Sequence, residues 1–325
     1  MTDVPKAELH VHLEGTAPPD LIRRIAERNG LPVPEGVFGA PDRFAYTDFL
    51  DFLKTYDKAA SVIRTGDDYR DITYEYLMSC SAEGAIYVEL TASPDHAKLV
   101  GLSDEEHLDG IARGIDDARA DSGIEGRILI SCVRNFGVEP ALRVARYAAD
   151  RPHPYVVGFS MAGDEEGYPP GAYAEAFRIA AGAGLGCTVH AGEWAGPESV
   201  REGLELPISR IGHGVRSIED PALVEELAER GTVLEVCPTS NVVLGIYPSY
   251  EEHPLPRLLE AGVRVTLGSD DPPYFGASIG GEYAVCRERL GLDDDTLRGI
   301  TQTAIEAAFC DDKLKQSLIK KDVGS

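Results

Sequence analysis

The sequence lacks the features that mark a membrane or secreted protein. No stretch of about 18 apolar residues occurs, so no segment is expected to span a bilayer. The N-terminal residues contain no apolar run behind a basic start, which predicts that no signal peptide is present. Neither of the common glycine-rich phosphate loops occurs, so the usual nucleotide-binding motifs are excluded.

Positive charge is scarce. The 325 residues include 31 Lys and Arg against 55 Asp and Glu, which gives a net charge of −24. Such a surface repels phosphate backbones and anionic lipids, so neither nucleic acid nor a membrane is an expected partner. The six cysteines form no Cys-x-x-Cys pair and are expected to be reduced and mostly buried, which indicates a cytoplasmic protein. The sequence does not indicate an oligomeric state.

The chain does contain a regular alternation of short β-rich apolar runs and helix-like stretches. The eight runs are residues 8–13, 86–91, 128–133, 156–160, 187–190, 210–213, 233–237 and 263–268. No low-complexity linker interrupts them. They predict an α/β fold, a single (β/α)₈ TIM-type barrel with extra helices over residues 1–321, with a doubly wound open sheet as the alternative. Residues 322–325 are set apart as a tail of the kind that an expression vector adds.

Polar side chains help to decide between the two folds. Residue types that bind ligands follow the ends of several runs, at His10 and His12, Ser160, His190 and Glu193, His213, and Asp270 and Asp271. A barrel gathers the carboxyl ends of all its strands at one mouth, whereas an open sheet leaves many of them far apart. The distribution therefore favours a barrel with the functional site at that mouth.

His10 and His12 are separated by one residue. On a strand, two such residues point to the same face, so both imidazoles are expected to face the barrel interior, with Val11 and Leu13 facing outward. Two buried imidazoles side by side usually share a metal ion. A His-x-His pair also arises by accident, so a purely structural role for both rings stays open at this point.

Three further segments carry complementary groups. His190 offers a third nitrogen ligand, and Glu193 lies three residues later, where it can reach over the pocket as a general acid or base. Asp270 and Asp271 follow the last run, and His213 lies between two glycines. Taken singly, these are also explained as a helix N-cap, a surface turn and a buried structural histidine. Together, three histidines and one aspartate indicate a Zn²⁺ site with acid–base groups beside it.

Other motifs carry less weight. Residues 158–162 read Gly-Phe-Ser-Met-Ala and miss the last glycine of a Gly-x-Ser-x-Gly elbow, so a serine-hydrolase mechanism is rejected. Residues 44–63 predict a long helix whose apolar stripe faces the core. The remaining histidines are interpreted as loop or helix residues without a functional role: His96, His107, His153 and His253.

The motifs together resemble those of the adenosine/adenine deaminase family of metal-dependent aminohydrolases. The resemblance runs from Pro-Lys-Ala-Glu-Leu-His-Val-His-Leu-Glu-Gly at residues 5–15 to Ser-Asp-Asp-Pro at residues 269–272, and it includes residues 161–165, 190–193 and 212–214. It implies a barrel enzyme with one Zn²⁺ per chain. The implied metal ligands are His10, His12, His190 and Asp270.

The same resemblance implies the catalytic groups. Glu193 would protonate N1 of a purine ring, His213 would orient the attacking water, and Asp271 would bind N7. Residues 49–63 would form an apolar helix that covers the substrate as a lid. The apolar stripe of this helix would then face the substrate and not only the core. The substrate contacts implied are His12, Glu14, Leu53, Tyr56, Asp271 and the backbone N–H of Gly163, which would meet N3.

The expected reaction is zinc-dependent hydrolytic deamination of a 6-aminopurine with release of ammonia. Adenosine or a close nucleoside analogue is favoured as the substrate. Glu14 stands where adenosine-specific members usually carry Asp, and Gly212 stands where adenine-specific members often carry Asp, so free adenine and a 5′-modified adenosine are the alternatives. Two other classes stay open: a non-catalytic purine-binding barrel, and a hydrolase that cuts an ester or lactone with the same metal.

Overall fold

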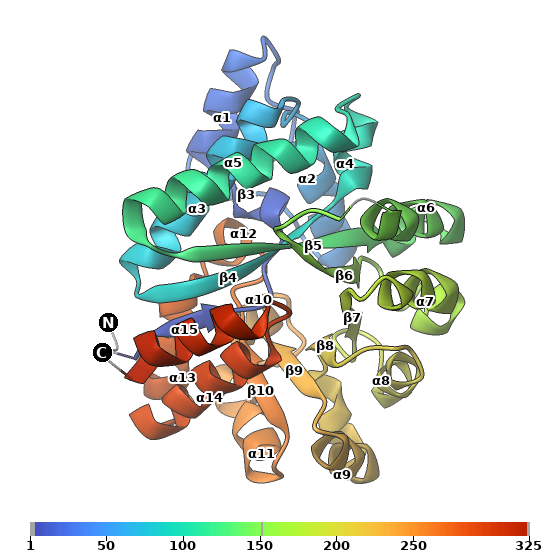
Figure 1. Cartoon of the computed structure of the whole chain (residues 1–325), viewed down its shortest axis with the longest axis vertical. Coiled ribbons are helices and arrows are strands. Elements are labelled where there is room, and N and C mark those ends of the chain that lie inside the picture. Colours follow the sequence, from blue (N-terminus) through green and yellow to red (C-terminus); the bar gives the residue numbers. More distant parts are fainter. Residues whose placement is uncertain (1–3, 151, 324–325) are drawn as a thin grey trace.

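A computed structural model describes residues 4–150 and 152–323 of the chain. Eight strands form one parallel sheet in the order of the chain, in the middle of the molecule (Figure 1). They are β1 (Lys6–Glu8), β4 (Ala85–Ala92), β5 (Glu125–Val133), β6 (Val156–Ala162), β7 (Gly186–Ala191), β8 (Arg210–His213), β9 (Val233–Val236) and β10 (Arg264–Leu267). Seven of them coincide with predicted runs, whereas β1 shares only Glu8 with the first run. Because no strand order reverses, the sheet is the predicted (β/α)₈ barrel and not a doubly wound sheet.

The barrel closes between β1 and β10 at the carboxyl ends of these two strands. The backbone N–H of His12 donates to the carbonyl of Asp270 (3.0 Å), and the N–H of Asp270 donates to the carbonyl of His10 (3.2 Å). Gly268 permits this approach, since a Cβ atom at that position would lie 2.5 Å from the carbonyl oxygen of His10. The first and last strands of the chain are therefore joined through residues of the predicted site.

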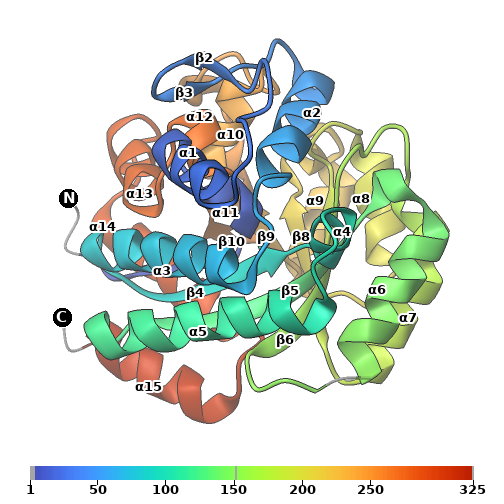
Figure 2. The same ribbon diagram turned by 90° about the horizontal axis from the view of Figure 1, so that it is seen from above.

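Helices surround the strands (Figures 1 and 2). They are α1 (Pro19–Arg28), α2 (Phe49–Ala60), α3 (Gly66–Ala82), α4 (Pro94–Leu99), α5 (Asp104–Ser122), α6 (Val138–Asp150), α7 (Ala174–Gly182), α8 (Pro197–Leu204), α9 (Pro221–Arg230), α10 (Pro238–Val243), α11 (Leu255–Glu260), α12 (Pro272–Phe275), α13 (Ile279–Glu288), α14 (Asp294–Ala307) and α15 (Asp312–Val323). Over the described residues, none of these helices is long and apolar enough to cross a membrane.

Local chemistry explains where α9 begins and ends. The side chain of Asp220 accepts hydrogen bonds from the N–H groups of Ala222 and Leu223, and Pro221 occupies the first helical position. Gly231 ends the helix in a left-handed conformation with φ of 66°. The local sequence therefore accounts for both ends of the helix.

Two predicted elements differ from the structure. The first apolar run was expected to be strand throughout, but β1 ends at Glu8, and the chain continues past it through single bridges at Val11 and His12. The helix predicted over residues 44–63 is shorter, because Phe44 pairs in a hairpin of β2 (Phe38–Ala40) and β3 (Arg43–Phe44). That hairpin lies beside α2 in Figure 2.

The cysteines and the C-terminal end complete the description. All six cysteines are free and buried, as predicted. Helix α15 continues to Val323, past the predicted domain limit at residue 321, and residues 324–325 lie outside the described part of the chain.

Candidate active site

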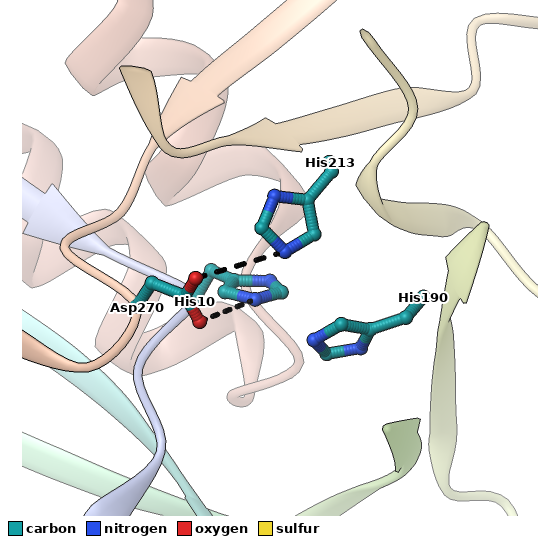
Figure 3. Close-up of side chains that lie close together, drawn as sticks. All are labelled: His10, His190, His213 and Asp270. Carbon is teal, nitrogen blue, oxygen red and sulfur yellow. Dashed lines mark ion pairs between the residues drawn. The ribbon is translucent and has the colours of Figure 1, made fainter. Parts of the chain in front are cut away.

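Four predicted site residues from separate parts of the barrel meet at the carboxyl ends of the strands. His10, His190, His213 and Asp270 point toward one another (Figure 3), and their ligand atoms all lie within 4.8 Å of each other. Asp270 Oδ1 is 3.6 Å from His10 Nε2, and Asp270 Oδ2 is 3.9 Å from His213 Nε2. The ends of β1, β7, β8 and β10 therefore form one cluster of buried metal-binding groups.

His12 joins this cluster from the side of the cavity. Its Nε2 atom lies 3.1 Å from His190 Nε2 and 3.2 Å from Asp270 Oδ1. The predicted ligands His10, His190 and Asp270 thus lie in one group whose fourth member is His213, while His12 forms a second group with Asp270 and Asp271.

The donor chemistry of the cluster fits a zinc ion. Imidazole nitrogens and one carboxylate are zinc ligands, and a tetrahedron with metal–ligand distances of about 2.0 Å has edges of about 3.3 Å. The separations of 3.1, 3.2 and 3.6 Å among His12, His190, Asp270 and His10 lie near that edge length. His10 Nε2 and His213 Nε2 are both buried without a hydrogen-bond partner, so each can face a cation or a bound water. The 3.9 Å separation of His213 fits less well.

Two of the cluster residues are oriented by a second polar partner. His10 Nδ1 lies 2.9 Å from Glu235 Oε2, and the other oxygen of Glu235 lies 2.6 Å from Arg210 Nε. The hydroxyl of Ser240 donates to Asp270 Oδ2 (2.6 Å). Such contacts fix the rotamer of a ligand and the nitrogen that it presents.

The backbone itself is unusual at two of the same residues. His213 (φ 59°) and Asp270 (φ 64°) are the two non-glycine residues with positive φ in the part of the chain that the structure describes. Left-handed backbone is unfavourable for both residue types and persists only where the surrounding structure enforces it. Contacts in the rest of the fold therefore offset the unfavourable backbone conformation that orients these two side chains.

The segment that carries Glu193 is held by a buried carboxylate from the neighbouring loop. Glu165 accepts hydrogen bonds from four successive backbone N–H groups, those of residues 192 (2.5 Å), 193 (3.0 Å), 194 (2.8 Å) and 195 (3.2 Å). Gly192 supplies the left-handed turn (φ 71°) that lets these N–H groups converge on one anion. Arg134 adds a further hydrogen bond from its Nη2 atom to the carbonyl of His190 (2.6 Å).

Two buried carboxyl groups face the cavity with raised pKa values. Burial raises the pKa of Glu193 well above its usual value, and the nearby charge of Asp270 adds to the effect. Burial and the charge of Asp270 likewise raise the pKa of Asp271. Asp271 lies tightly against Gly15, where a Cβ atom would be 1.8 Å from its Oδ1 atom. Burial therefore favours the protonated form of both carboxyl groups.

Glu14 lies at another wall of the cavity and is almost fully buried. Its carboxylate accepts hydrogen bonds from the hydroxyl of Tyr69 (3.2 Å), the N–H of Ser93 (3.1 Å) and the hydroxyl of Tyr56 (3.4 Å). The Nε2 atom of His107 lies 3.8 Å away. A carboxylate has about four acceptor positions, so protein groups take up most of the capacity of Glu14.

Helix α2 roofs the cavity. Phe49 packs against Trp194, next to Glu193, with ring centroids 4.8 Å apart. Near the other end of the helix, Asp57 lies 2.9 Å from the Nε2 atom of His96 on α4. The cavity measures about 110 Å³. The six predicted substrate-contact residues all line it: His12, Glu14, Leu53, Tyr56, Gly163 and Asp271.

The other four histidines lie in helices or loops, as predicted: His96 is on α4, His107 is on α5, and His153 and His253 lie outside helices and strands. His96, His107 and His253 are buried, and each lies within ion-pair or hydrogen-bond distance of a polar side chain at or behind the site. His153 is partly exposed. The sequence also gave no role to Glu165 or Glu235. A charged residue inside an apolar strand run, as in Val-Leu-Glu-Val at residues 233–236, is the signal that could have identified Glu235.

Comparison with known proteins agrees with this geometry. A family model described as adenosine deaminase matches residues 5–323. A protein named adenine deaminase from Chelativorans sp. (strain BNC1) is 50% identical over 317 residues, which cover 97% of each chain. The crystal structure of an adenine deaminase from Arthrobacter aurescens has a TM-score of 0.91 at 30% identity and covers 99% of this chain and 98% of its own. An amidohydrolase from Burkholderia ambifaria with bound Zn has a TM-score of 0.89 at 26% identity, with 99% of this chain and 90% of its own covered.

Proposed function

This chain belongs to the adenosine deaminase family, and on that premise we propose that it hydrolyses free adenine to hypoxanthine and ammonia. The family places it among the hydrolases that act on C–N bonds. The relative at 50% identity and the structure at a TM-score of 0.91 both carry the name adenine deaminase, which supports the alternative substrate of the sequence analysis over adenosine.

The metal-binding residues in this proposal are His10, His12, His190 and Asp270. A bound zinc ion lowers the pKa of water to about 7 and so supplies a nucleophile at neutral pH. The protein's own part is to fix these four groups at the closed seam of the barrel and to exclude bulk water beneath α2. The zinc-bound amidohydrolase at 26% identity supports the choice of metal.

The acid groups suit a purine ring. N1 and N7 of adenine are hydrogen-bond acceptors, so a carboxyl group that meets either of them must carry a proton. Burial raises the pKa of Glu193 and of Asp271, which favours that protonated state. Glu193 would give its proton to N1 as water attacks C6, Asp271 would hold N7, and the N–H of Gly163 would meet N3. One proton of the water would restore Glu193 and the other would pass to the 6-amino nitrogen, so that the C6–N bond breaks, ammonia leaves and C6 keeps the oxygen.

The choice of adenine as the substrate rests on the hydrogen bonds that Glu14 already accepts from protein groups. In the adenosine-specific pattern, the acidic residue at this position meets the ribose 5′-hydroxyl. Here the carboxylate is almost fully buried and accepts three hydrogen bonds from Tyr56, Tyr69 and Ser93. A ribose hydroxyl would have to compete with these donors for the acceptor capacity that remains on the carboxylate, which weakens its hydrogen bond.

A side-by-side assay tests the proposal. Zinc-loaded protein is supplied with adenine, adenosine and a 5′-modified adenosine at equal concentration, and ammonia release is measured. We expect kcat/KM for adenine to exceed that for either nucleoside by at least about 10²-fold. A preference for a nucleoside would contradict the choice of base, whereas inactivity on all three would favour a purine-binding barrel or an ester hydrolase.

The proposal also places the protein in the cytoplasm and gives it a small purine as its ligand. The six free, buried cysteines support a reducing compartment.

A further inference from the structure

Three buried side chains form a row that leads away from the cavity behind His213. His213 Nδ1 lies 3.2 Å from Asn241 Nδ2, and Asn241 Oδ1 lies 3.1 Å from His253 Nε2. The row ends at the backbone, where the N–H of Leu255 donates to His253 Nδ1 (3.2 Å). The three residues come from the end of β8, from α10 and from the segment before α11, and all are almost inaccessible to solvent.

The backbone end of the row fixes the direction of every hydrogen bond in it. A backbone N–H can only donate, so His253 Nδ1 carries no proton and the single proton of that ring is on Nε2. His253 Nε2 therefore donates to the amide oxygen of Asn241. The amide nitrogen then faces His213 Nδ1 and donates to it, so the proton of the His213 ring is on Nε2.

The reverse orientation of the Asn241 amide is excluded by the same reasoning. It would place the amide nitrogen, a donor, against His253 Nε2, which is also a donor because Nδ1 is occupied by the backbone N–H of Leu255. Two buried donors in contact would each lose a hydrogen bond, at a cost of about 1–3 kcal/mol per group. Burial also lowers the pKa of His253 to about 3, so the ring has no second proton to offer.

We propose that Asn241 and His253 are positioning residues that hold His213 in its Nε2–H tautomer, with the N–H directed into the active site. His213 Nε2 is buried, has no hydrogen-bond partner, and lies 3.7 Å from Glu193 Oε1 and 3.9 Å from Asp270 Oδ2. A protonated nitrogen cannot bind a metal ion. His213 is therefore a hydrogen-bond donor toward the attacking water, and His12 is the third histidine ligand.

This inference rests on the proposed function for the role of His213, but the tautomer follows from the hydrogen-bond row alone. Asn241→Asp tests it most directly, because the substitution keeps the shape of the side chain and replaces the donor by an acceptor. The new carboxylate would accept a proton from His213 Nδ1 and leave Nε2 without one. A reversed imidazole tautomer in a catalytic site costs up to about 10⁴-fold in rate elsewhere.

The first measurement is spectroscopic and needs no turnover. ¹⁵N spectra of histidine-labelled, zinc-loaded protein report which ring nitrogen is protonated, and His213→Gln identifies the His213 signals. We expect the proton on Nε2 in the unaltered protein and on Nδ1 in Asn241→Asp. A proton on Nδ1 of His213 in the unaltered protein would overturn the proposal, whatever the substrate proves to be.

The second measurement is zinc content. His12→Ala should lose most of its zinc, whereas His213→Ala should retain about one equivalent per chain. The opposite pattern would make His213 the ligand and end the proposal.

The third measurement is kinetic. Asn241→Asp and Asn241→Ala should lower kcat for adenine at least about 10-fold with KM nearly unchanged, and His253→Ala should act in the same direction more weakly. Val243→Ala, at an exposed position of the same helix, serves as the matched control and should retain full activity. In a His213→Ala background, Asn241→Ala should have no further effect. An equal loss in both backgrounds would show that Asn241 acts on the fold and not through His213.

Discussion

The strand ends that form the floor of the cavity and the helix that roofs it are held in different ways. On the floor, His10 is fixed by Glu235, Asp270 by Ser240, and the loop of Glu193 by Glu165, all through buried hydrogen bonds. The roof, α2, contacts the barrel through aromatic rings, through a long hydrogen bond from the Tyr56 hydroxyl to Glu14 (3.4 Å), and through the pair of Asp57 with His96, in which the Asp57 side chain is 53% exposed.

The difference indicates that the two regions have different functions in the reaction. Buried polar networks are costly to leave half satisfied, so they hold side chains within a narrow geometry. Aromatic contacts and exposed ion pairs are weaker and less directional, which suits a helix that must admit a substrate. Substitutions on the floor should therefore act on the chemical step, and substitutions on the roof should act on substrate entry and release.

The largest effect is expected for Glu193→Gln on the floor. The amide keeps the shape of the side chain but cannot transfer a proton to N1, so kcat should fall by about 10²–10⁴-fold. Binding of the product hypoxanthine, measured by calorimetry, should change little. Turnover at the normal rate would remove Glu193 from the mechanism.

Glu165→Gln should have the next largest effect. The amide nitrogen of Gln cannot accept the N–H groups of residues 192–195, so the loop of Glu193 should shift and kcat should fall by about 10- to 10²-fold. Steady-state kinetics and zinc analysis check this, because zinc content should stay near one per chain. The neighbouring exposed residue provides the control, and Glu166→Gln should behave as the unaltered protein. If Glu165→Gln changed KM alone, the floor and the roof would not be distinct.

Asp57→Asn tests the roof. The exposed pair with His96 contributes about 1 kcal/mol or less, so its loss should change KM by less than about fivefold and leave kcat unaltered. A fall in kcat comparable with that of Glu165→Gln would mean that the roof also aligns the reacting groups.

The smallest effect is expected on the free energy of unfolding. Burial raises the pKa of Glu282 on α13 from 4.5 to about 8. Between these two values the unfolded chain releases a proton that the folded chain keeps, so the free energy of unfolding falls as pH rises through this window.

Glu282→Gln removes this penalty and keeps the acceptor for the N–H of Thr239. Calorimetry at pH 5 and pH 8 should show a gain in Tm over the unaltered protein of roughly 2 °C or more at pH 8 and almost none at pH 5. A gain of equal size at both pH values would show that the carboxyl group does not titrate in this window.

The sequence predicted the eight strands and the convergence of residues 10, 12, 190, 213 and 270 because each lies at the end of an apolar run, and parallel strands end at one mouth. It did not predict that β1 would stop at Glu8, since the alternation of residues 8–13 continues beyond the paired strand. It assigned no role to His253, because the partner that gives that ring its role, Asn241, lies on a different helix.

The sequence also could not identify the residues that hold the floor of the cavity in place. Glu235 lies 225 residues from His10, and Glu165 lies 27 residues from Gly192, and no local spacing connects such pairs. The substrate was also underdetermined. Glu14 and Gly212 pointed to different members of the family, and the hydrogen bonds from Tyr56 and Tyr69 to the Glu14 carboxylate became visible only in three dimensions.

The hydrogen bonds that join residues 10–12 to Asp270 have a consequence for the assembly of the enzyme. The groups proposed to share one ion come from both ends of the chain, and they meet only after the final strand has docked against the first. A growing polypeptide that still lacks β10 has no complete coordination sphere, however well its earlier strands are formed. The metal site is therefore completed only when the barrel closes, and a folding intermediate that lacks β10 cannot catalyse deamination.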